Sequence, residues 1–236
     1  MDAAITEAFE LTWPAAEYAD VGGFRVGRGL GAGGRVSSAR ALGNWTHDDI
    51  GLAISQHAEW GQSPLFRALD NDQPLIDALK KHGFRRENPT AIMEIGTAAL
   101  TDREIPPVTA FAIWPPLAIQ REIWASGNIN PARQDVMLRV AAPRTAILGR
   151  IEDRAAGAAF IAIHRKVAMA HCVEILPGLR RKGLAGWIMR CAAYWAAKHG
   201  AERIALAVSR ANSGAVALYS QLGFQEVAGY SYYAAD

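Results

Sequence analysis

The segment PGLRRKGLA, residues 177–185, combines residue types that can hold a phosphate group. Three consecutive cations at positions 180–182 precede Gly183 and a run of small and aliphatic residues. If a helix begins here, its first backbone N–H groups have no acceptor within the helix and point outward toward an anion. Gly183 and Ala185 would let a bulky ligand approach the backbone. On its own the segment also fits an exposed turn with solvated cations.

Two other phosphate-binding patterns are disfavoured. Lys182 precedes Gly183 and no Ser or Thr follows to bind magnesium, so residues 177–185 are not a Walker loop. Residues 29–34, GLGAGG, satisfy the G-x-G-x-x-G pattern of dinucleotide sites. That pattern needs a helix directly after it, and RVSSARALG, which follows, has no helical spacing. We therefore predict a turn at 29–34, and a dinucleotide-dependent oxidoreductase has little support.

The elements expected around residues 177–185 are strands and helices in alternation. Strands are predicted at residues 108–114, 144–153, 155–165, 166–176, 202–209 and 227–236. Helices are predicted at residues 117–125, 131–141, 183–199 and 212–222. The run at 155–165 is nearly all apolar, which indicates a strand buried on both faces. The fold class is therefore α/β with mixed α+β character, and the cationic segment joins a strand to a helix.

The first hundred residues are less regular. Residues 9–15 and 22–43 suggest two short strands around the glycine-rich turn, followed by a helix at 46–61 and a strand at 63–70. Residues 97–107 carry charge, proline and no periodicity, which is typical of a linker. We therefore predict two domains, at residues 1–100 and 107–236.

A weak internal repeat connects the two parts. The helix expected at residues 75–87 ends in Gly-Phe, as does the one at 215–227, and a strand follows each. The alignment puts Leu79 where the second half has Tyr219. Nothing in the first half matches residues 177–185, so only the second half has the residues for catalysis.

Two motifs in the second half resemble the signatures of the GNAT superfamily of acyl-CoA-dependent N-acyltransferases. The first, [Q/R]-x-x-G-x-[G/A] after a strand and Pro177, is matched by Arg180, Arg181, Lys182, Gly183, Leu184 and Ala185. The second, N-x-x-A-x-x-L-Y followed by Gly-Phe, is matched by Asn212, Ala215, Leu218, Tyr219, Gly223 and Phe224. The resemblance covers residues 107–236. It implies a GNAT fold, a central mixed and mostly antiparallel sheet flanked by helices, preceded by a partial, degenerate GNAT-like repeat of the tandem type.

The resemblance also implies acetyl-CoA as co-substrate. By analogy, the strand ending at Leu176 diverges from its neighbour, and the main chain of Val173, Glu174 and Ile175 pairs with the pantetheine arm. The pyrophosphate would lie on the loop residues, which are Arg180, Arg181, Lys182, Gly183, Leu184, Ala185 and Gly186. Asn212 would contact the cofactor near the end of its pantetheine arm.

The reaction implied is direct attack of an amine on the thioester in a ternary complex. Tyr219 is the candidate acid, because an ordinary tyrosine pKa near 10 keeps its proton available for the departing thiolate. Glu174 is our first choice for the base and His171 the second. On a regular strand these two side chains face opposite sides, so at most one reaches the amine unless a bulge intervenes.

Composition limits the partners. Lys and Arg number 25 against 23 Asp and Glu, so no nucleic-acid footprint is expected. The N-terminal segment has acids where a signal peptide has cations, and no apolar run spans a bilayer, which predicts a cytoplasmic protein without membrane contact. Cys172 and Cys191 have no metal-ligand spacing. The expected partner is a small-molecule or peptide amine, and a homodimer stays open.

The sequence thus predicts an N-acetyltransferase that moves an acetyl group from acetyl-CoA to a primary amine. The alternative is a non-catalytic CoA-binding module that regulates or binds a partner, and Tyr219 favours the enzyme because a sensor needs no proton donor. The acceptor pocket would be built from variable segments such as 114–145, so the amine is not identified by the sequence.

Overall fold

The structure is a computed structural model that describes residues 1–141 and 143–235. Within these ranges it forms one continuous eleven-stranded sheet with the order β1-β2-β3-β4-β11-β5-β10-β9-β8-β7-β6. The strands of the first half are β1 (Glu17–Val21), β2 (Phe24–Arg28), β3 (Ala39–Ala41), β4 (Leu65–Leu69) and β5 (Arg85–Gly96). Those of the second half are β6 (Ala110–Ile113), β7 (Arg144–Ile151), β8 (Arg154–His164), β9 (Val167–Ile175), β10 (Arg203–Ser209) and β11 (Gln225–Ala234).

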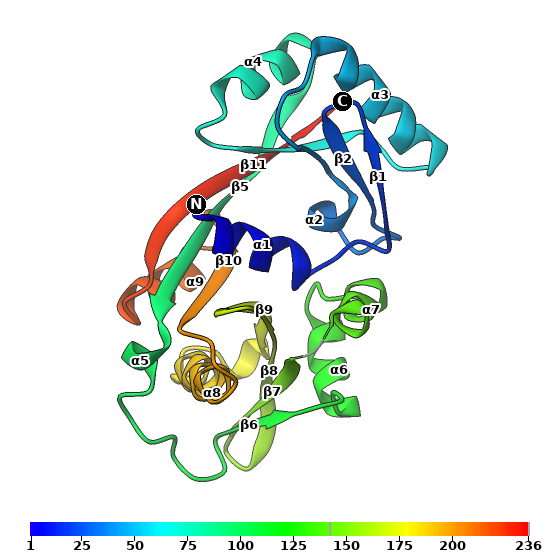
Figure 1. Cartoon of the computed structure of the whole chain (residues 1–236). Coiled ribbons are helices and arrows are strands. Elements are labelled where there is room, and N and C mark those ends of the chain that lie inside the picture. The colour runs from blue at the N-terminus through cyan, green and yellow to red at the C-terminus, as the bar shows by residue number, and fades with distance from the viewer. Residues whose placement is uncertain (142, 236) are drawn as a thin grey trace.

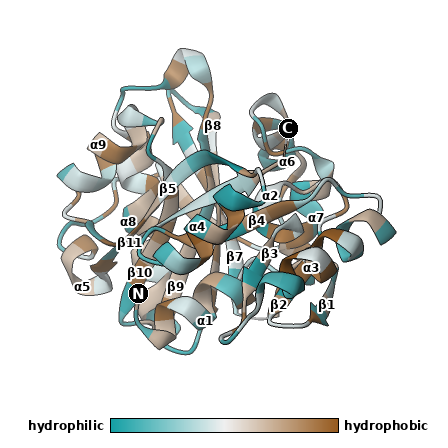
Figure 2. Ribbon diagram, turned by 90° about the horizontal axis from the view of Figure 1, so that it is seen from above, coloured by the Kyte–Doolittle hydropathy of each residue, from teal (hydrophilic) through white to brown (hydrophobic). Residues whose placement is uncertain are grey.

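Helices cover the sheet on both sides. They are α1 (Ala3–Leu11), α2 (Gly34–Ser37), α3 (His47–Glu59), α4 (Gln73–Lys81), α5 (Thr97–Leu100), α6 (Ala118–Ser126), α7 (Pro131–Arg139), α8 (Leu184–Lys198) and α9 (Ser213–Gln221), with a short 3₁₀ turn η1 at Pro177–Leu179. Figure 2 shows hydrophilic and hydrophobic residues mixed along α3 and α4, as expected for helices with one face on a core.

The two halves exchange their last strands. β4 pairs with β11 of the second half, and β10 pairs with β5 of the first half, all antiparallel. β5 and β11 pair with each other along their length and run side by side through the middle of the molecule (Figure 1). Neither half therefore completes its sheet with its own final strand.

The internal repeat is confirmed in the topology. α4 and α9 begin at Asp72 and Asn212, whose side chains accept the N–H of Leu75 and Ala215. Glycines at 83 and 223 follow the two helices with φ of 86° and 93°. The mixed sheet flanked by helices is the fold class expected. The division at residues 97–107 stays a prediction, and α5 begins that segment.

One early expectation is wrong. Residues 9–11 belong to α1 and not to a strand, because Asp2 caps the helix by accepting the N–H of Ile5 at 2.8 Å. Ile5, Ala8 and Phe9 then form its buried face, at the three-and-four spacing of a helix. This face packs over the centre of the sheet, against residues such as Val167.

The remaining elements follow the expected order. β2 and β3 flank the glycine-rich segment, as predicted, and α2 adds one helical turn between them. β8 is buried on both faces over most of its length, in agreement with its apolar sequence. Its alanines let α8 lie close on one side, where Ile188 and Met189 join the main core.

Candidate functional site

β9 and β10 separate halfway along their length. They pair in parallel from Val167 and Arg203 to Ala170 and Leu206, where the pairing recorded for these two strands ends. β9 continues along β8 as far as Ile175. The edge of β9 beyond Ala170 therefore faces an opening in the sheet, which is the divergence that the resemblance to the GNAT superfamily implies.

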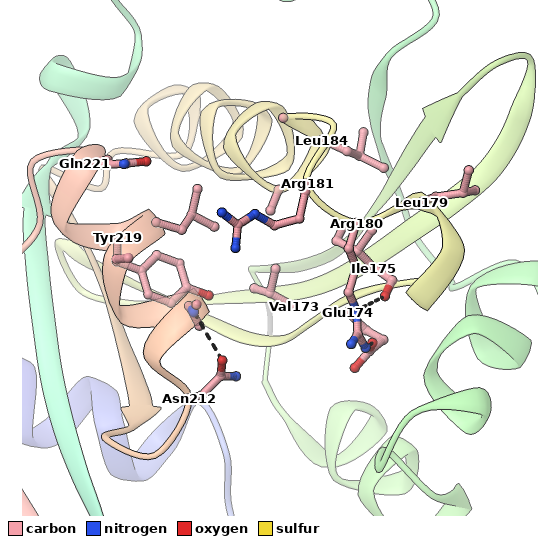
Figure 3. A pocket seen from close by; sticks show the side chains of 16 residues that line it. Val173, Glu174, Ile175, Leu179, Arg180, Arg181, Leu184, Asn212, Tyr219 and Gln221 are labelled. Carbon is pink, nitrogen blue, oxygen red and sulfur yellow. Dashed lines mark hydrogen bonds and ion pairs between the residues drawn. The ribbon is translucent and has the colours of Figure 1, made fainter.

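A cavity of about 570 Å³ lies at this opening. Its walls include the end of β9, the loop before α8 and the first turns of α9 (Figure 3). Of the predicted cofactor residues, it is lined by Val173, Glu174, Ile175, Arg180, Arg181, Gly183, Leu184, Ala185 and Asn212. Lys182 and Gly186 are not among the lining residues, and the Gly186 N–H donates to Gly183 O at 3.1 Å.

The loop before α8 is shaped to receive an anion. Arg181 and Gly183 both have positive φ, 63° and 82°, and Gly183 caps α8 without a side-chain hydrogen bond. The first N–H groups of this 15-residue helix therefore stay available at the cavity wall. The Arg181 side chain extends into the cavity toward Tyr219 (Figure 3).

The neighbouring cations have partners in the protein. Arg180 Nη2 lies 3.0 Å from Glu174 Oε1, and its Nε donates to Ile175 O at 2.9 Å. Lys182 Nζ lies 2.5 Å from Glu152 Oε1. Arg181 is thus the cation of this loop best placed to meet a phosphate.

Tyr219 lies where the sheet opens. It is buried, and its ring packs edge-on against Phe224 at 5.6 Å between ring centroids. Burial raises the pKa of Tyr219 to about 12. The hydroxyl therefore keeps its proton at neutral pH.

A β-bulge brings the two candidate bases to one face of the sheet. Glu174 pairs with Ala158 and His171 pairs with Phe160, so two residues of β9 oppose one of β8. Cys172 at the bulge has φ of 51°. Because Ala158 and Phe160 point the same way on β8, Glu174 and His171 do so on β9.

His171 is fully engaged inside the protein. Thr12 Oγ1 donates to Ala8 O, so it accepts the Nε2–H of His171 at 2.9 Å. Arg35 Nη1 donates to Nδ1 at 3.2 Å. Burial, and then the charge of Arg35, lower the pKa of His171 well below its usual value. A neutral ring with both nitrogens bonded has no lone pair left for a substrate proton.

Glu174 is better placed to act on a substrate. Its side chain is 15% exposed and held by Arg180. The turn between α6 and α7 packs on it so closely that a Cβ at Gly127 would lie 2.7 Å from Glu174 Oε2. The carboxylate is therefore fixed in place and still reachable.

A second cavity of about 840 Å³ lies between the two halves. Residues of the first half that line it include Trp13, Ala32, Gly33, Gly34 and Arg35. It shares Val173, Glu174, Arg180, Asn212, Ala215 and Tyr219 with the first cavity. The two cavities therefore meet beside Glu174 and Tyr219.

Sequence reasoning missed the part that the first half plays here. Residues 29–33 form the predicted turn, but the expectation that no helix follows is wrong, since α2 begins at Gly34. Ala32, Gly33 and Gly34 form a wall of the second cavity. No local pattern signals this, since Arg35 meets His171 across 136 positions. Residues 127–129, in contrast, fall within the variable segment expected to build the acceptor pocket.

Other kinds of site find no support among the described residues. No group of three or more His, Cys, Asp or Glu residues is arranged to hold a metal ion there. In the same part of the chain, no helix has the length and apolar character needed to cross a membrane.

Comparison with known proteins identifies the second half. Residues 112–224 match the model of the acetyltransferase (GNAT) family. No curated protein sequence matches this chain. A GCN5-related N-acetyltransferase from Kribbella flavida has a similar structure, with a TM-score of 0.70 and 17% identity over 99% of this chain and 93% of that one.

Two further structures are similar along most of the chain. A tandem GNAT protein from the clavulanic acid biosynthesis pathway has a TM-score of 0.61 and 13% identity over 84% of this chain and 74% of its own. A conserved protein of unknown function from Staphylococcus epidermidis has a TM-score of 0.67 and 10% identity over 91% of each chain. At these identities the likeness establishes the fold alone.

Proposed function

Because this chain is a member of the GNAT superfamily through its domain at residues 112–224, we propose that it transfers an acetyl group from acetyl-CoA to a primary amine. The observation that carries the proposal is the meeting of two cavities where β9 and β10 diverge. The first cavity contains the loop before α8, which can bind an anion. The second cavity gives another substrate a separate route to Glu174 and Tyr219. Such an arrangement lets two substrates meet without a covalent enzyme intermediate.

The first cavity suits acetyl-CoA. The free N–H groups at the start of α8 and the Arg181 side chain would hold the pyrophosphate. The unpaired edge of β9, at residues 173–175, would pair with the amide groups of the pantetheine arm. Asn212 uses its side-chain oxygen to cap α9 and lines the same cavity, where its amide N–H₂ can donate to the cofactor.

The second cavity suits the amine. Glu174 would take a proton from the attacking ammonium group, either directly or through one water molecule. Arg180 holds the carboxylate from one side and Gly127 leaves it room on the other. His171 would serve to position the strand, because both of its nitrogens are bonded to the protein.

Tyr219 would protonate the departing thiolate. Because the Tyr219 hydroxyl is buried and keeps its proton at neutral pH, it could donate that proton to a thiolate formed beside it. The C–S bond of the tetrahedral intermediate then breaks as the proton moves from Tyr219 to sulfur, and solvent restores the tyrosine proton.

The test is a calorimetric titration with acetyl-CoA, followed by a CoA-release assay with a panel of primary amines. Gly183→Glu should weaken acetyl-CoA binding at least 100-fold, because a carboxylate would repel the pyrophosphate. Gly200→Glu is the matched control, since Gly200 ends α8 with φ of 83° against 82° at Gly183 and neither Cβ would meet an atom within 4 Å. Equal effects at the two sites, or no binding by the wild-type chain, would contradict the proposed function.

A further inference from the structure

One arginine of the second cavity is half-buried and forms no ion pair with a described carboxylate. Arg35 lines this cavity at the start of α2. Resting on the function proposed above, we propose that the acceptor substrate is an amine that also carries a carboxylate, as in an amino acid, and that Arg35 binds this carboxylate.

The contacts of Arg35 leave part of its guanidinium unused. One Nη1 proton goes to His171 Nδ1 and one Nη2 proton to the carbonyl oxygen of Phe9. The Nε of Arg35 is buried without a hydrogen-bond partner in the protein. Of five N–H donors, three are thus unpaired, and none of the described carboxylates forms an ion pair with this side chain.

The surrounding charges do not compensate for it. The nearby carboxylate of Glu10 is bound to two other arginines, Arg67 by a short ion pair and Arg40 at 3.3 Å. Three guanidinium groups therefore surround one carboxylate, and desolvation lowers the pKa of Arg35. The Phe9 ring, whose centroid lies 3.6 Å from Arg35 Cζ, contributes a cation–π contact but no negative charge. A partly desolvated guanidinium without a carboxylate partner is costly, so a bound anion would stabilise this wall of the cavity.

The other charged side chains of the cavity favour a single negative charge on the substrate. Glu174 and Arg180 form an ion pair. Arg133 donates to Asn128 O at 3.1 Å, and Glu87 is exposed on another wall. The described lining thus includes three arginines and two glutamates, and this balance suits a substrate group with one negative charge, such as a carboxylate, better than a dianionic phosphate.

The spacing suits a small substrate. Arg35 contacts His171, and His171 and Glu174 oppose residues of β8 that lie two positions apart. Two strand positions correspond to about 7 Å. A small amino acid can therefore place its amine near Glu174 and its carboxylate near Arg35.

The experiment compares matched amines in the CoA-release assay. Amino acids with two to six carbons are each paired with their carboxamides, which keep the shape and remove the charge. For at least one pair, kcat/KM should be 10- to 100-fold higher for the acid, the range of a charge-assisted hydrogen bond. This ratio needs no variant of the protein. Equal rates for every acid and its amide would overturn the proposal and leave the acetyltransferase function standing.

Arg35→Met should abolish that preference and act mainly on KM, whereas Arg35→Lys should retain part of it. Arg28→Met is the matched control, since Arg28 is the last residue of β2 and its exposed side chain pairs with Glu17 of β1. A fall in kcat that is equal for acids and amides would make Arg35 structural and overturn its assignment. Absence of acetyl-CoA binding in calorimetry would remove the proposed function, and this inference with it.

Discussion

The same supersecondary unit occurs twice in this chain, and only one copy is equipped for chemistry. α4 and α9 have the same capping pattern, and in both turns a phenylalanine N–H donates 3.0 Å back to the helix, from Phe84 to Leu79 O and from Phe224 to Tyr219 O. Leu79 is fully buried in the core of the first half, whereas Tyr219 borders both cavities. At this position the first copy has a packing side chain, and the second copy has the tyrosine proposed as proton donor.

The helix starts differ in the same way. α3 follows β3 as α8 follows β9, yet Asp49 in its first turn accepts the Thr46 N–H at 2.8 Å. A carboxylate of the protein therefore lies in the first turn of α3, whereas the start of α8 has free N–H groups and the Arg181 side chain beside it. A carboxylate at a helix start disfavours a bound anion, so only the start of α8 is suited to one.

The largest expected effect tests the difference between Leu79 and Tyr219. Tyr219→Phe should lower kcat by about 10²- to 10⁴-fold, because the thiolate loses its proton donor. Acetyl-CoA affinity should change little, since the ring and its packing on Phe224 remain. Stopped-flow measurement of CoA release, with calorimetry as control, checks this. Unchanged kcat would place Tyr219 with Leu79 as a packing residue.

Leu79→Ala tests the structural side of the same pair. Leu79 is 0% exposed, so its truncation should lower the free energy of unfolding by about 2–5 kcal/mol. Leu79→Met should cost less than about 1.5 kcal/mol, because the volume is nearly conserved. Urea denaturation followed by tryptophan fluorescence measures both. A loss of kcat in folded Leu79→Ala, with acetyl-CoA affinity intact, would mean that the first copy takes part in chemistry after all.

A smaller effect should separate the cations before α8. Arg181→Met should weaken acetyl-CoA binding by about tenfold, the value of one charge-assisted hydrogen bond. Lys182→Met should weaken it no more than about threefold, because Lys182 is bound to Glu152. Calorimetric titration of the two variants with acetyl-CoA measures both effects. A larger loss of affinity for Lys182→Met than for Arg181→Met would show that the ion pair between Lys182 and Glu152 opens when the cofactor binds.

The smallest effect concerns pH. His171 and Arg40 occupy corresponding places in the two halves. Each follows the last residue of its strand that pairs in parallel with the next strand, since Ala170 pairs with β10 and Ala39 with β4. Folding depresses the pKa of His171, so the contribution of its neutral ring to stability is present above pH ~6.5. This contribution is lost as the pH falls below that value. The free energy of unfolding should fall by up to about 1.4 kcal/mol per pH unit there.

The control for this pH dependence is His171→Gln, which cannot titrate. Urea denaturation at pH 7.5 and 5.5 should show a smaller loss of stability for this variant than for the wild type. Identical losses would show that other groups cause the acid sensitivity and that the His171 ring is protonated in the folded state.

Local patterns predicted the elements that carry the cofactor site. The cations before Gly183, the helix after them and the Asn212 cap are all set within a few residues, so spacing and capping rules apply to them. The bulge at Cys172 was anticipated only as a condition for His171 and Glu174 to share a face. The Cys172 carbonyl oxygen has its partner outside β9, since Trp124 Nε1 of α6 donates to it at 2.9 Å.

The second cavity could not be predicted in this way. It depends on α1, on the turn that leads to Arg35 and on the strand exchange, which join residues more than 100 positions apart. No periodicity encodes such contacts. Hydrophobic spacing also left α1 unrecognised, because its helical signal begins before residue 9 with the Asp2 cap.

The exchange of β5 and β11 has a consequence for biosynthesis. β11 is made after every other strand but lies near the middle of the sheet, between β4 and β5. Until β11 has been synthesised, the edges of β4 and β5 that pair with it in the folded protein therefore have no native partner. The nascent first half must be protected from pairing with other chains until the last strand arrives.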